Sequence, residues 1–435
     1  MSVPWPVEGD ELLDRYAARV LDSGVATAVA VAVTDRRRTL VARTYGDALP
    51  DALWPIASIG KSLAAVVALQ LVEEGVLDLH APVTQYVPWL TVRSRFAPIT
   101  LHHLLTHTAG VIESSDRAPA SDYDVIALAE TEAGFAPGEH RSYSNIGYRA
   151  VGVVLEAVTG RPFADLIQRR VLDRVGMRAS VPVMLHETRR RLPHGHVPLY
   201  DDRPWQRDHG LVPAPWVESA EADGCQCCSL EDLAIYLRAL WNGTSLFSPA
   251  SLTAMKTAQP PCDEWPYGYG LEVQPDGFGH GGDMLGYVSH MWAETAAGVG
   301  VVAFANGFRG ASWLGEGALA IATRRPPPDL EREPSAPLAD DGTCPPRWTP
   351  YLGRYRSHNP WLPTFLVAAS RHALVMGMDW LAGSQRLPLT PVSDDTFRIG
   401  EPDWSPERLS FDTVVGRRAQ RAAYNGTQYY RAFTT

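Results

Sequence analysis

A proline-rich segment divides this chain in two. Residues 326–350 hold eight prolines in 25 positions. Proline fixes its own φ angle and removes a backbone hydrogen-bond donor, so neither a helix nor an inner strand continues through such a segment. The 435 residues are therefore expected to form a large N-terminal part, residues 1–325, and a small C-terminal part, residues 351–435, joined by a semi-rigid linker.

The large part carries both helix and strand patterns. Apolar residues recur at helical spacing over residues 9–22 and 58–74, and Gly75 ends the second of these helices. β-Branched runs at residues 25–33 and 39–45 predict a hairpin. Further elements are expected as helices at residues 147–159, after Ser229 and at 313–323, as strands at 285–295 and 299–305, and as short helices that fill roughly residues 80–260.

The small part has a different pattern. Short strand-like runs alternate with turns, at residues 365–367, 373–376, 396–399 and 429–430. This spacing is typical of a small antiparallel β domain.

Composition and charge exclude several classes of protein. A hydrophobic fraction of 45% and a charged fraction of 20% are those of a globular chain and not of a disordered one. A net charge of −10 without a cluster of cations argues against a nucleic-acid partner. No apolar run reaches the ~20 residues that span a bilayer, and residues 1–10 do not begin an export signal. We therefore expect a cytoplasmic protein, of an oligomeric state that the sequence does not indicate.

Several cysteines and histidines raise the question of a metal. The spacing of the cysteines matches no common zinc pattern, so we expect structural thiols near the cleft. His103 and His107 are four residues apart, as in some zinc sites, but no glutamate follows His103 as one follows the first histidine of zinc hydrolases. The residues considered are Cys225, Cys227, Cys228, His103, His107, His194 and His196.

The tetrapeptide Ser58-Ile59-Gly60-Lys61 opens the apolar helix of residues 58–74. Residues three apart on a helix share a face, so the Ser58 hydroxyl and the Lys61 amine can meet. A serine becomes a nucleophile when a base takes its proton, and lysine is such a base when burial lowers its pKa. The N–H of Ser58 at the helix start is a candidate oxyanion donor. Alone, the tetrapeptide is also common on helix surfaces.

A second segment, Tyr143-Ser144-Asn145, precedes the helix predicted at residues 147–159. A tyrosine beside a lysine can share its proton and act as a general acid or base. Asn145 could hold the lysine or a substrate amide. The structural alternative is a turn that caps the helix.

A third segment, His280-Gly281-Gly282, lies in a glycine-rich stretch. Glycines allow a substrate to approach the backbone closely, and a strand edge there could supply a second oxyanion N–H. The structural alternative is a glycine-rich hairpin with an incidental histidine.

In this order, the three segments resemble those of the serine β-lactamase and penicillin-binding-protein superfamily, in its class C β-lactamase-like branch of esterases and D-amino-acid peptidases. Supporting stretches are Leu104–Gly110, Pro137–Glu139, Thr159-Gly160 and Tyr267–Leu271. The resemblance implies an α+β fold with a β-lactamase/transpeptidase-like antiparallel sheet, flanked by helices and carrying an inserted all-α subdomain over roughly residues 80–260. Residues 351–435 resemble the lipocalin-like domain of some members.

The resemblance also implies a role for each segment. Ser58 would be the acylated nucleophile, with Lys61 and Tyr143 as its acid/base pair in acylation and deacylation, and Asn145 would orient Lys61 and the substrate. No cofactor and no metal are expected. The remaining substrate-binding residues would be His280, Gly281 and Gly282, and the oxyanion hole would consist of the N–H groups of Ser58 and Asp283.

His280 stands where many relatives have lysine. A lysine there binds the carboxylate of penicillins or of a C-terminal D-alanine, whereas histidine is mostly neutral at pH 7. We therefore expect ester or amide substrates without that carboxylate. We also expect activity to change between about pH 5.5 and 7.5 as His280 titrates.

The sequence thus predicts a serine hydrolase that forms an acyl-enzyme on the ester or amide carbonyl of a small-molecule or peptide substrate, as an esterase or D-amino-acid peptidase. One alternative is a penicillin-binding-protein-type thioesterase that releases and cyclises a nonribosomal peptide. Another is a true β-lactamase or DD-carboxypeptidase. A catalytically silent binding protein, from another class, would be expected to lose Ser58, Lys61 or Tyr143, and all three are present.

Overall fold

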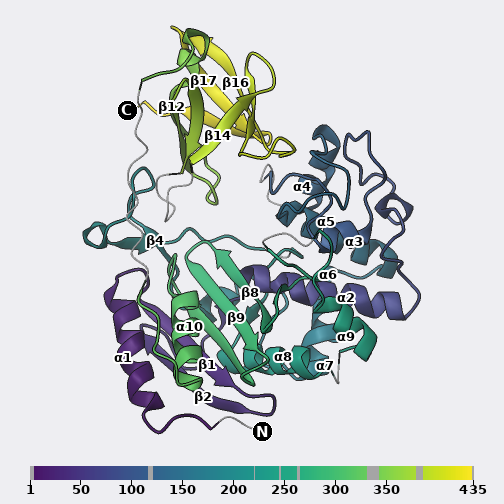
Figure 1. The fold of residues 1–435 in the computed structure, drawn as a ribbon, viewed down its shortest axis with the longest axis vertical. Coiled ribbons are helices and arrows are strands. Elements are labelled where there is room, and N and C mark those ends of the chain that lie inside the picture. The colour runs from purple at the N-terminus through teal and green to yellow at the C-terminus, as the bar shows by residue number, and fades with distance from the viewer. Residues whose placement is uncertain are drawn as a thin grey trace.

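The computed structural model describes residues 4–115, 121–219, 221–243, 246–261, 265–330, 342–378 and 386–433. It consists of a body built on one sheet with helices on both faces and, at the opposite end of the long axis, a β-barrel formed by the C-terminal part (Figure 1). Part of the predicted linker, residues 331–341, lies outside the described residues. Within the described ranges, no helix has the length and apolar character needed to cross a membrane.

The central sheet is antiparallel, in the order β2-β1-β10-β9-β8-β7. Every residue of the inner strands β1 and β10 is buried, because helices cover both faces of the sheet. The four strands predicted in this part are confirmed, with shifts of a few residues at their ends. The strands are β1 (Ala28–Thr34), β2 (Thr39–Gly46), β7 (Glu272–Gln274), β8 (Gly277–Met284), β9 (Tyr287–Glu294) and β10 (Val299–Ala305).

The terminal helices of the body cover one face of the sheet. These are α1 (Gly9–Asp22) and α10 (Ala311–Ala322), which also pack on each other. On the other face, α8 (Leu230–Asn242) packs on β1, β9 and β10. Behind it lies α2 (Gly60–Glu73), which is apolar nearly all round and correspondingly buried. The start of α2 is thereby held rigidly in the core.

Residues 80–260, predicted as an inserted helical subdomain, hold mainly short helices. They also hold the strand pair of β4 and β5, and strand β6, which pairs with β3 (Trp54–Pro55) alongside the segment that leads into Ser58. The elements within these residues are α3 (Leu101–Leu105), α4 (Ser121–Ala127), α5 (Asn145–Thr159), α6 (Phe163–Ile167), α7 (Asp173–Val175), α9 (Pro249–Met255), β4 (His196–Pro198), β5 (Leu211–Pro213) and β6 (Cys227–Cys228). Whether this stretch is a separate folding unit stays a prediction.

The small antiparallel β domain is confirmed as a closed eight-stranded barrel. Closure comes from β18, which returns to pair with β11 and so leaves no free sheet edge. Aromatic side chains such as Tyr355, Phe397 and Phe411 fill its interior. The strands are β11 (Gly353–Arg356), β12 (Thr364–Ser370), β13 (Ala373–Gly377), β14 (Arg386–Pro391), β15 (Thr396–Ile399), β16 (Arg408–Val415), β17 (Arg418–Tyr424) and β18 (Thr427–Arg431).

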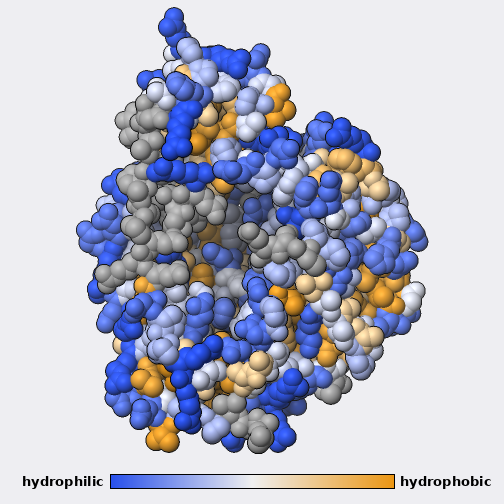
Figure 2. Space-filling view, viewed as in Figure 1, coloured by the Kyte–Doolittle hydropathy of each residue, from blue (hydrophilic) through white to orange (hydrophobic). Residues whose placement is uncertain are grey.

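The barrel is docked on the helical stretch of the body. The Trp404 ring stacks on His140, with ring centroids 4.6 Å apart. Glu407 Oε1 accepts a hydrogen bond from the Glu113 N–H at 2.8 Å, and Asn425 Nδ2 donates to the Ser114 carbonyl at 3.0 Å. The surface is hollowed between the barrel and the body (Figure 2). The barrel therefore stands at the rim of the cleft that the next subsection describes.

Candidate active site

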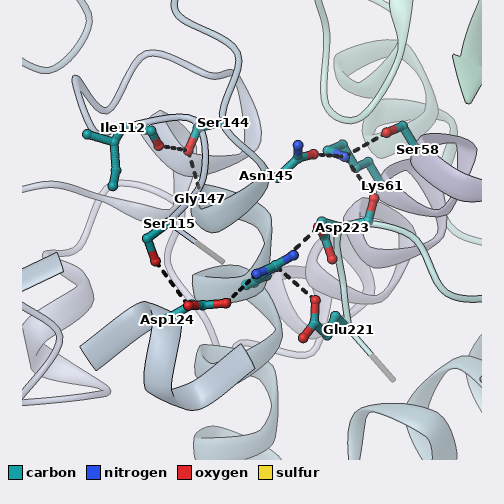
Figure 3. A network of polar contacts seen from close by, with 11 residues as sticks. Ser58, Lys61, Ile112, Ser115, Asp124, Ser144, Asn145, Gly147, Glu221 and Asp223 are labelled. Atoms are coloured by element: carbon teal, nitrogen blue, oxygen red, sulfur yellow. Dashed lines mark hydrogen bonds and ion pairs between the residues drawn. The ribbon is translucent and has the colours of Figure 1, made fainter. Parts of the chain in front are cut away.

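Ser58 and Lys61 meet as their spacing predicts. Ser58 lies in the 3₁₀ turn Ala57–Ile59, directly before α2, and Lys61 lies in the first turn of that helix. Lys61 Nζ is 3.0 Å from Ser58 Oγ (Figure 3). The lysine is fully buried, and burial lowers its pKa to about 7. A large fraction of Lys61 is therefore neutral at physiological pH.

The other partners of Lys61 decide where its lone pair points. Nζ donates to Asn145 Oδ1 and to the Asp223 carbonyl, both at 2.7 Å (Figure 3). Both partners are carbonyl oxygens, which only accept hydrogen bonds. A neutral amine has two N–H groups and one lone pair. When these oxygens take both N–H groups, the lone pair is left for the Ser58 hydroxyl, the geometry that a general base needs.

A buried polar cluster places the Asp223 carbonyl. The Arg149 guanidinium forms ion pairs with Asp124 at 2.5 Å, Glu221 at 2.8 Å and Asp223 at 3.2 Å. Ser115 Oγ in turn donates to Asp124 at 3.0 Å (Figure 3). Arg149 projects from α5, the helix that begins at Asn145. One helix thus orients both groups that hold the lysine amine.

The turn before α2 is held in an uncommon conformation. Ala57 has a φ of 46°, which few residues other than glycine adopt. Gly224 lies against it so closely that a Cβ there would be 2.2 Å from the Ala57 carbonyl oxygen. On the other side, a Cβ at Gly282 would be 2.4 Å from the Ile56 oxygen. The close packing of these two glycines therefore fixes the position of the Ser58 turn in the cleft.

Tyr143 lies over the lysine, with Lys61 Nζ 4.9 Å from its ring centroid. Burial raises the pKa of Tyr143 well above its ordinary value, and the hydrogen bond with the Ser58 hydroxyl lowers it by a smaller amount. The phenol is therefore protonated at rest. In this site Lys61 is the better first acceptor of the Ser58 proton, and Tyr143 is suited to pass a proton onward.

His107 holds Tyr143 from both sides, and sequence reasoning missed this role. The N–H of Ser144 donates to His107 Nδ1 at 3.0 Å, and the N–H of Ser142 donates to the His107 carbonyl at 2.8 Å. The imidazole and phenol ring centroids are 4.3 Å apart. His107 belongs to the stretch Leu104–Gly110 that supports the family resemblance, so that stretch was the available signal.

His280 lies where the resemblance implies, beside Tyr143, but it is 3% exposed. Its Nε2 is 3.0 Å from the Tyr267 hydroxyl, and its Nδ1 contacts the Gly281 carbonyl. Burial, followed by the nearby Lys61 charge, lowers the pKa of His280 to about 3. The expectation that His280 titrates between about pH 5.5 and 7.5 is therefore wrong, because an imidazole held among buried groups does not take up a proton there.

Strand β7 pairs only with residues 277–279 of β8. Beyond that point the backbone edge of β8 is open to the cleft. The N–H of Gly281 donates to the carboxylate of Glu272 in β7. Alternate N–H groups of a strand point to the same edge, so the N–H of Asp283 points away from β9 as that of Gly281 does. This supports the predicted use of the Asp283 N–H in an oxyanion hole.

Two cavities meet at Ser58, and both are also lined by Glu113, Asn145 and Asp283. The first has a volume of about 310 Å³ and the second of about 610 Å³. The second lies between β8, β9 and the start of α10. The first has a wall from the barrel, formed by Trp361, Leu362, Met378 and Tyr424.

The residues considered for a metal have structural surroundings. The three cysteines of the 225–228 segment are free and buried, and burial raises their pKa values. His103 Nδ1 lies 3.0 Å from the Thr100 hydroxyl in a helix cap, and His196 lies on β4. Across the ranges that the structure describes, no three histidine, cysteine or acidic side chains gather as a metal would require.

Comparisons with known proteins place the chain in a family. The family model described as Beta-lactamase matches residues 13–323. Esterase EstB of Burkholderia gladioli is 33% identical over 191 residues, 38% of this chain and 47% of that protein. The D-alanyl-D-alanine-carboxypeptidase/endopeptidase AmpH of Escherichia coli K12 is 25% identical over 208 residues, 43% of this chain and 53% of that protein. The chain thus spans about half the length of these relatives.

Two solved structures resemble nearly the whole chain. The octameric penicillin-binding protein homologue from Pyrococcus abyssi has a TM-score of 0.65 at 22% identity and covers 97% of this chain and 100% of its own. The crystal structure of SurE has a TM-score of 0.60 at 24% identity, and the match covers 98% of this chain and 99% of that chain. At these identities the likeness shows the fold.

Proposed function

The chain belongs to the beta-lactamase family of serine hydrolases, and from this membership we propose that it acts through a covalent acyl-enzyme on Ser58. The substrate is an ester or an amide, as for an esterase or a D-amino-acid peptidase. The observation that carries the proposal is the buried, low-pKa Lys61, whose N–H groups are taken by two carbonyl oxygens while Ser58 lies 3.0 Å from its nitrogen.

The reaction begins when Ser58 transfers its hydroxyl proton to neutral Lys61 and Oγ bonds to the substrate carbonyl carbon. The oxyanion accepts hydrogen bonds from the N–H groups of Ser58 and Asp283. The intermediate then collapses and expels an alcohol or amine. That leaving group takes the proton from Lys61 by way of the Tyr143 phenol. An ester between Ser58 and the acyl group remains.

Deacylation repeats these transfers in reverse. A water molecule gives its proton to the Lys61 and Tyr143 pair and attacks the acyl-enzyme, which releases the acid and restores the Ser58 hydroxyl. The second cavity, at about 610 Å³, favours one further candidate. An amine or alcohol seated there takes the acyl group in place of water, as in the thioesterase alternative.

The test is intact-mass spectrometry of the full chain and of Ser58→Ala after incubation with a fluorophosphonate, a penicillin, an aliphatic activated ester, a D-aminoacyl amide and a peptidyl thioester. We expect an adduct or turnover with the wild-type chain and none with Ser58→Ala. Ser219→Ala, which removes another serine of the first cavity, is the matched control and should keep the adduct. Adducts on Ser58→Ala at the wild-type rate would rule out the mechanism, and an acyl-amine product would favour transfer over hydrolysis.

A further inference from the structure

Strand β8 turns two side-chain positions toward the open cleft. Successive side chains of a strand point to opposite faces, so Gly281 and Asp283 share a face, while Gly282 faces the turn before α2. A Cβ at Gly281 would have no atom within 4 Å. The space beside the Asp283 carboxylate is therefore empty, and it belongs to the cleft that contains Ser58.

The Asp283 carboxylate has no hydrogen bond and no ion pair to any residue that the structure describes. It is open to the water of the cleft and lines both cavities beside Ser58. Partial loss of solvation raises its pKa to about 7, and an ammonium group bound beside it would lower the pKa again and favour the carboxylate.

The cations near the cleft are engaged elsewhere. Lys61 is buried behind Ser58, and Arg149 is shared among three carboxylates. Arg309 lines the second cavity, where its guanidinium lies 5.9 Å from the centroid of the Trp313 ring. His280 is neutral. The face of β8 next to the scissile bond thus offers an anion where a carboxylate-binding enzyme needs a cation.

We propose that the Asp283 side chain binds a protonated amine of the acyl donor close to the scissile carbonyl. The preferred substrates are then esters or amides that carry an ammonium group and lack a carboxylate. This inference rests on the proposed Ser58 acyl-enzyme and names its substrate class. An ammonium that enters the empty space above Gly281 meets the Asp283 carboxylate, whereas a substrate carboxylate there meets like charge.

The amine can belong to the acyl part or to the leaving group, because Asp283 borders both cavities. The first experiment therefore uses matched probes in both positions. For the leaving group, they are the butyrate esters of 2-(dimethylamino)ethanol, of 3-methylbutanol and of glycolate, which present a cation, a neutral isostere and an anion. For the acyl part, they are D-alanine p-nitroanilide and its N-acetyl derivative.

We expect the wild-type chain to prefer the ammonium probe of one pair over its neutral counterpart by roughly fivefold to tenfold in kcat/KM, the effect of one partly solvated ion pair. The glycolate ester should be the poorest of its series. In Asp283→Asn, which keeps the backbone N–H, the preference should fall to within about twofold. The ratio is taken within each protein, so a general loss of activity cancels.

Asp276→Asn, at the far turn of the same hairpin, is the control and should keep the wild-type ratio. Equal kcat/KM for cation and neutral probes in the wild-type chain, or a ratio that survives in Asp283→Asn, would overturn the inference. The wild-type series alone decides the point if the variant does not fold. A chain that forms no Ser58 adduct with any reagent would instead overturn the proposed function, and the fluorophosphonate readout separates the two failures.

Discussion

The backbone amides on either side of Tyr143 both donate to a single residue, His107, whose ring lies 4.3 Å from the phenol ring. His107 itself has a φ of 59°, a conformation that few residues other than glycine and asparagine adopt. The tyrosine of the proposed proton relay is therefore positioned by a residue that lies behind it and is 1% exposed.

Replacement of His107 by leucine should lower kcat by about tenfold to a hundredfold with little change in KM. The Tyr143 phenol would then no longer be held in position for proton transfer, whereas the residues that line the cleft are unchanged. His107→Asn should recover most of kcat, since the asparagine oxygen can accept the Ser144 N–H and asparagine tolerates a positive φ. Steady-state kinetics with thermal melts of both variants check this. Equal losses in the two variants would show that only packing matters.

The pH profile should reflect Lys61 and not His280. Because the neutral lysine is the base and its pKa is lowered to about 7, kcat/KM should rise with pH through about 7 and fall off below it. A neutral ester is the substrate of choice, since it is insensitive to the charge on Asp283. His280→Gln should not shift this rise of kcat/KM with pH, because the pKa of His280 is about 3. A shifted rise in His280→Gln would restore the role that the sequence suggested.

Gly224→Ala should be destabilised by about 1–3 kcal/mol and lose most activity, because its Cβ would lie 2.2 Å from the Ala57 oxygen and its φ is 146°. Gly281→Ala is the matched comparison, because a Cβ there meets nothing within 4 Å. Urea unfolding should give Gly281→Ala the wild-type stability. Equal stabilities of the two variants would mean that the turn before α2 yields more easily than its packing indicates.

Arg149→Met should destabilise the fold by about 3–5 kcal/mol, since it leaves buried carboxylates without their cation. The carboxylate of Asp124, 1% exposed, suffers most. Urea unfolding of the wild type and of Arg149→Met measures this difference. An unchanged free energy of unfolding would show that the cluster does not depend on its cation.

The sequence predicts well what is local. The helix predicted over residues 58–74 and the cap at Ser229 follow from residues close together in the chain. The structure confirms both, with the α-helix itself beginning at Gly60 after the 3₁₀ turn that contains Ser58. The meeting of Ser58 with Lys61 follows from helical spacing alone. Tyr143 and Asn145 were placed beside them through family resemblance, and their contacts with Lys61 agree.

What depends on distant packing could not be predicted. The pKa of His280 is set by the groups that bury it, including Tyr267 and Lys61, and an isolated histidine pattern contains no measure of burial. The two hydrogen bonds that position Tyr143 join His107 to the backbone amides of Ser142 and Ser144, more than thirty positions away in the sequence. Closure of the barrel depends on the pairing of β11 with β18, and its position at the cleft depends on contacts such as Glu407 with Glu113.

The wall that the barrel contributes to the first cavity has an evolutionary consequence. The barrel has a hydrophobic core of its own, and Trp361 and Leu362 reach the cleft from the loop between β11 and β12. Substitutions in such a loop can reshape the first cavity without touching any group that moves a proton. Substrate range and chemical machinery can therefore diverge at separate rates within one polypeptide, and an exchange of barrels between paralogues would be a direct route to new selectivity.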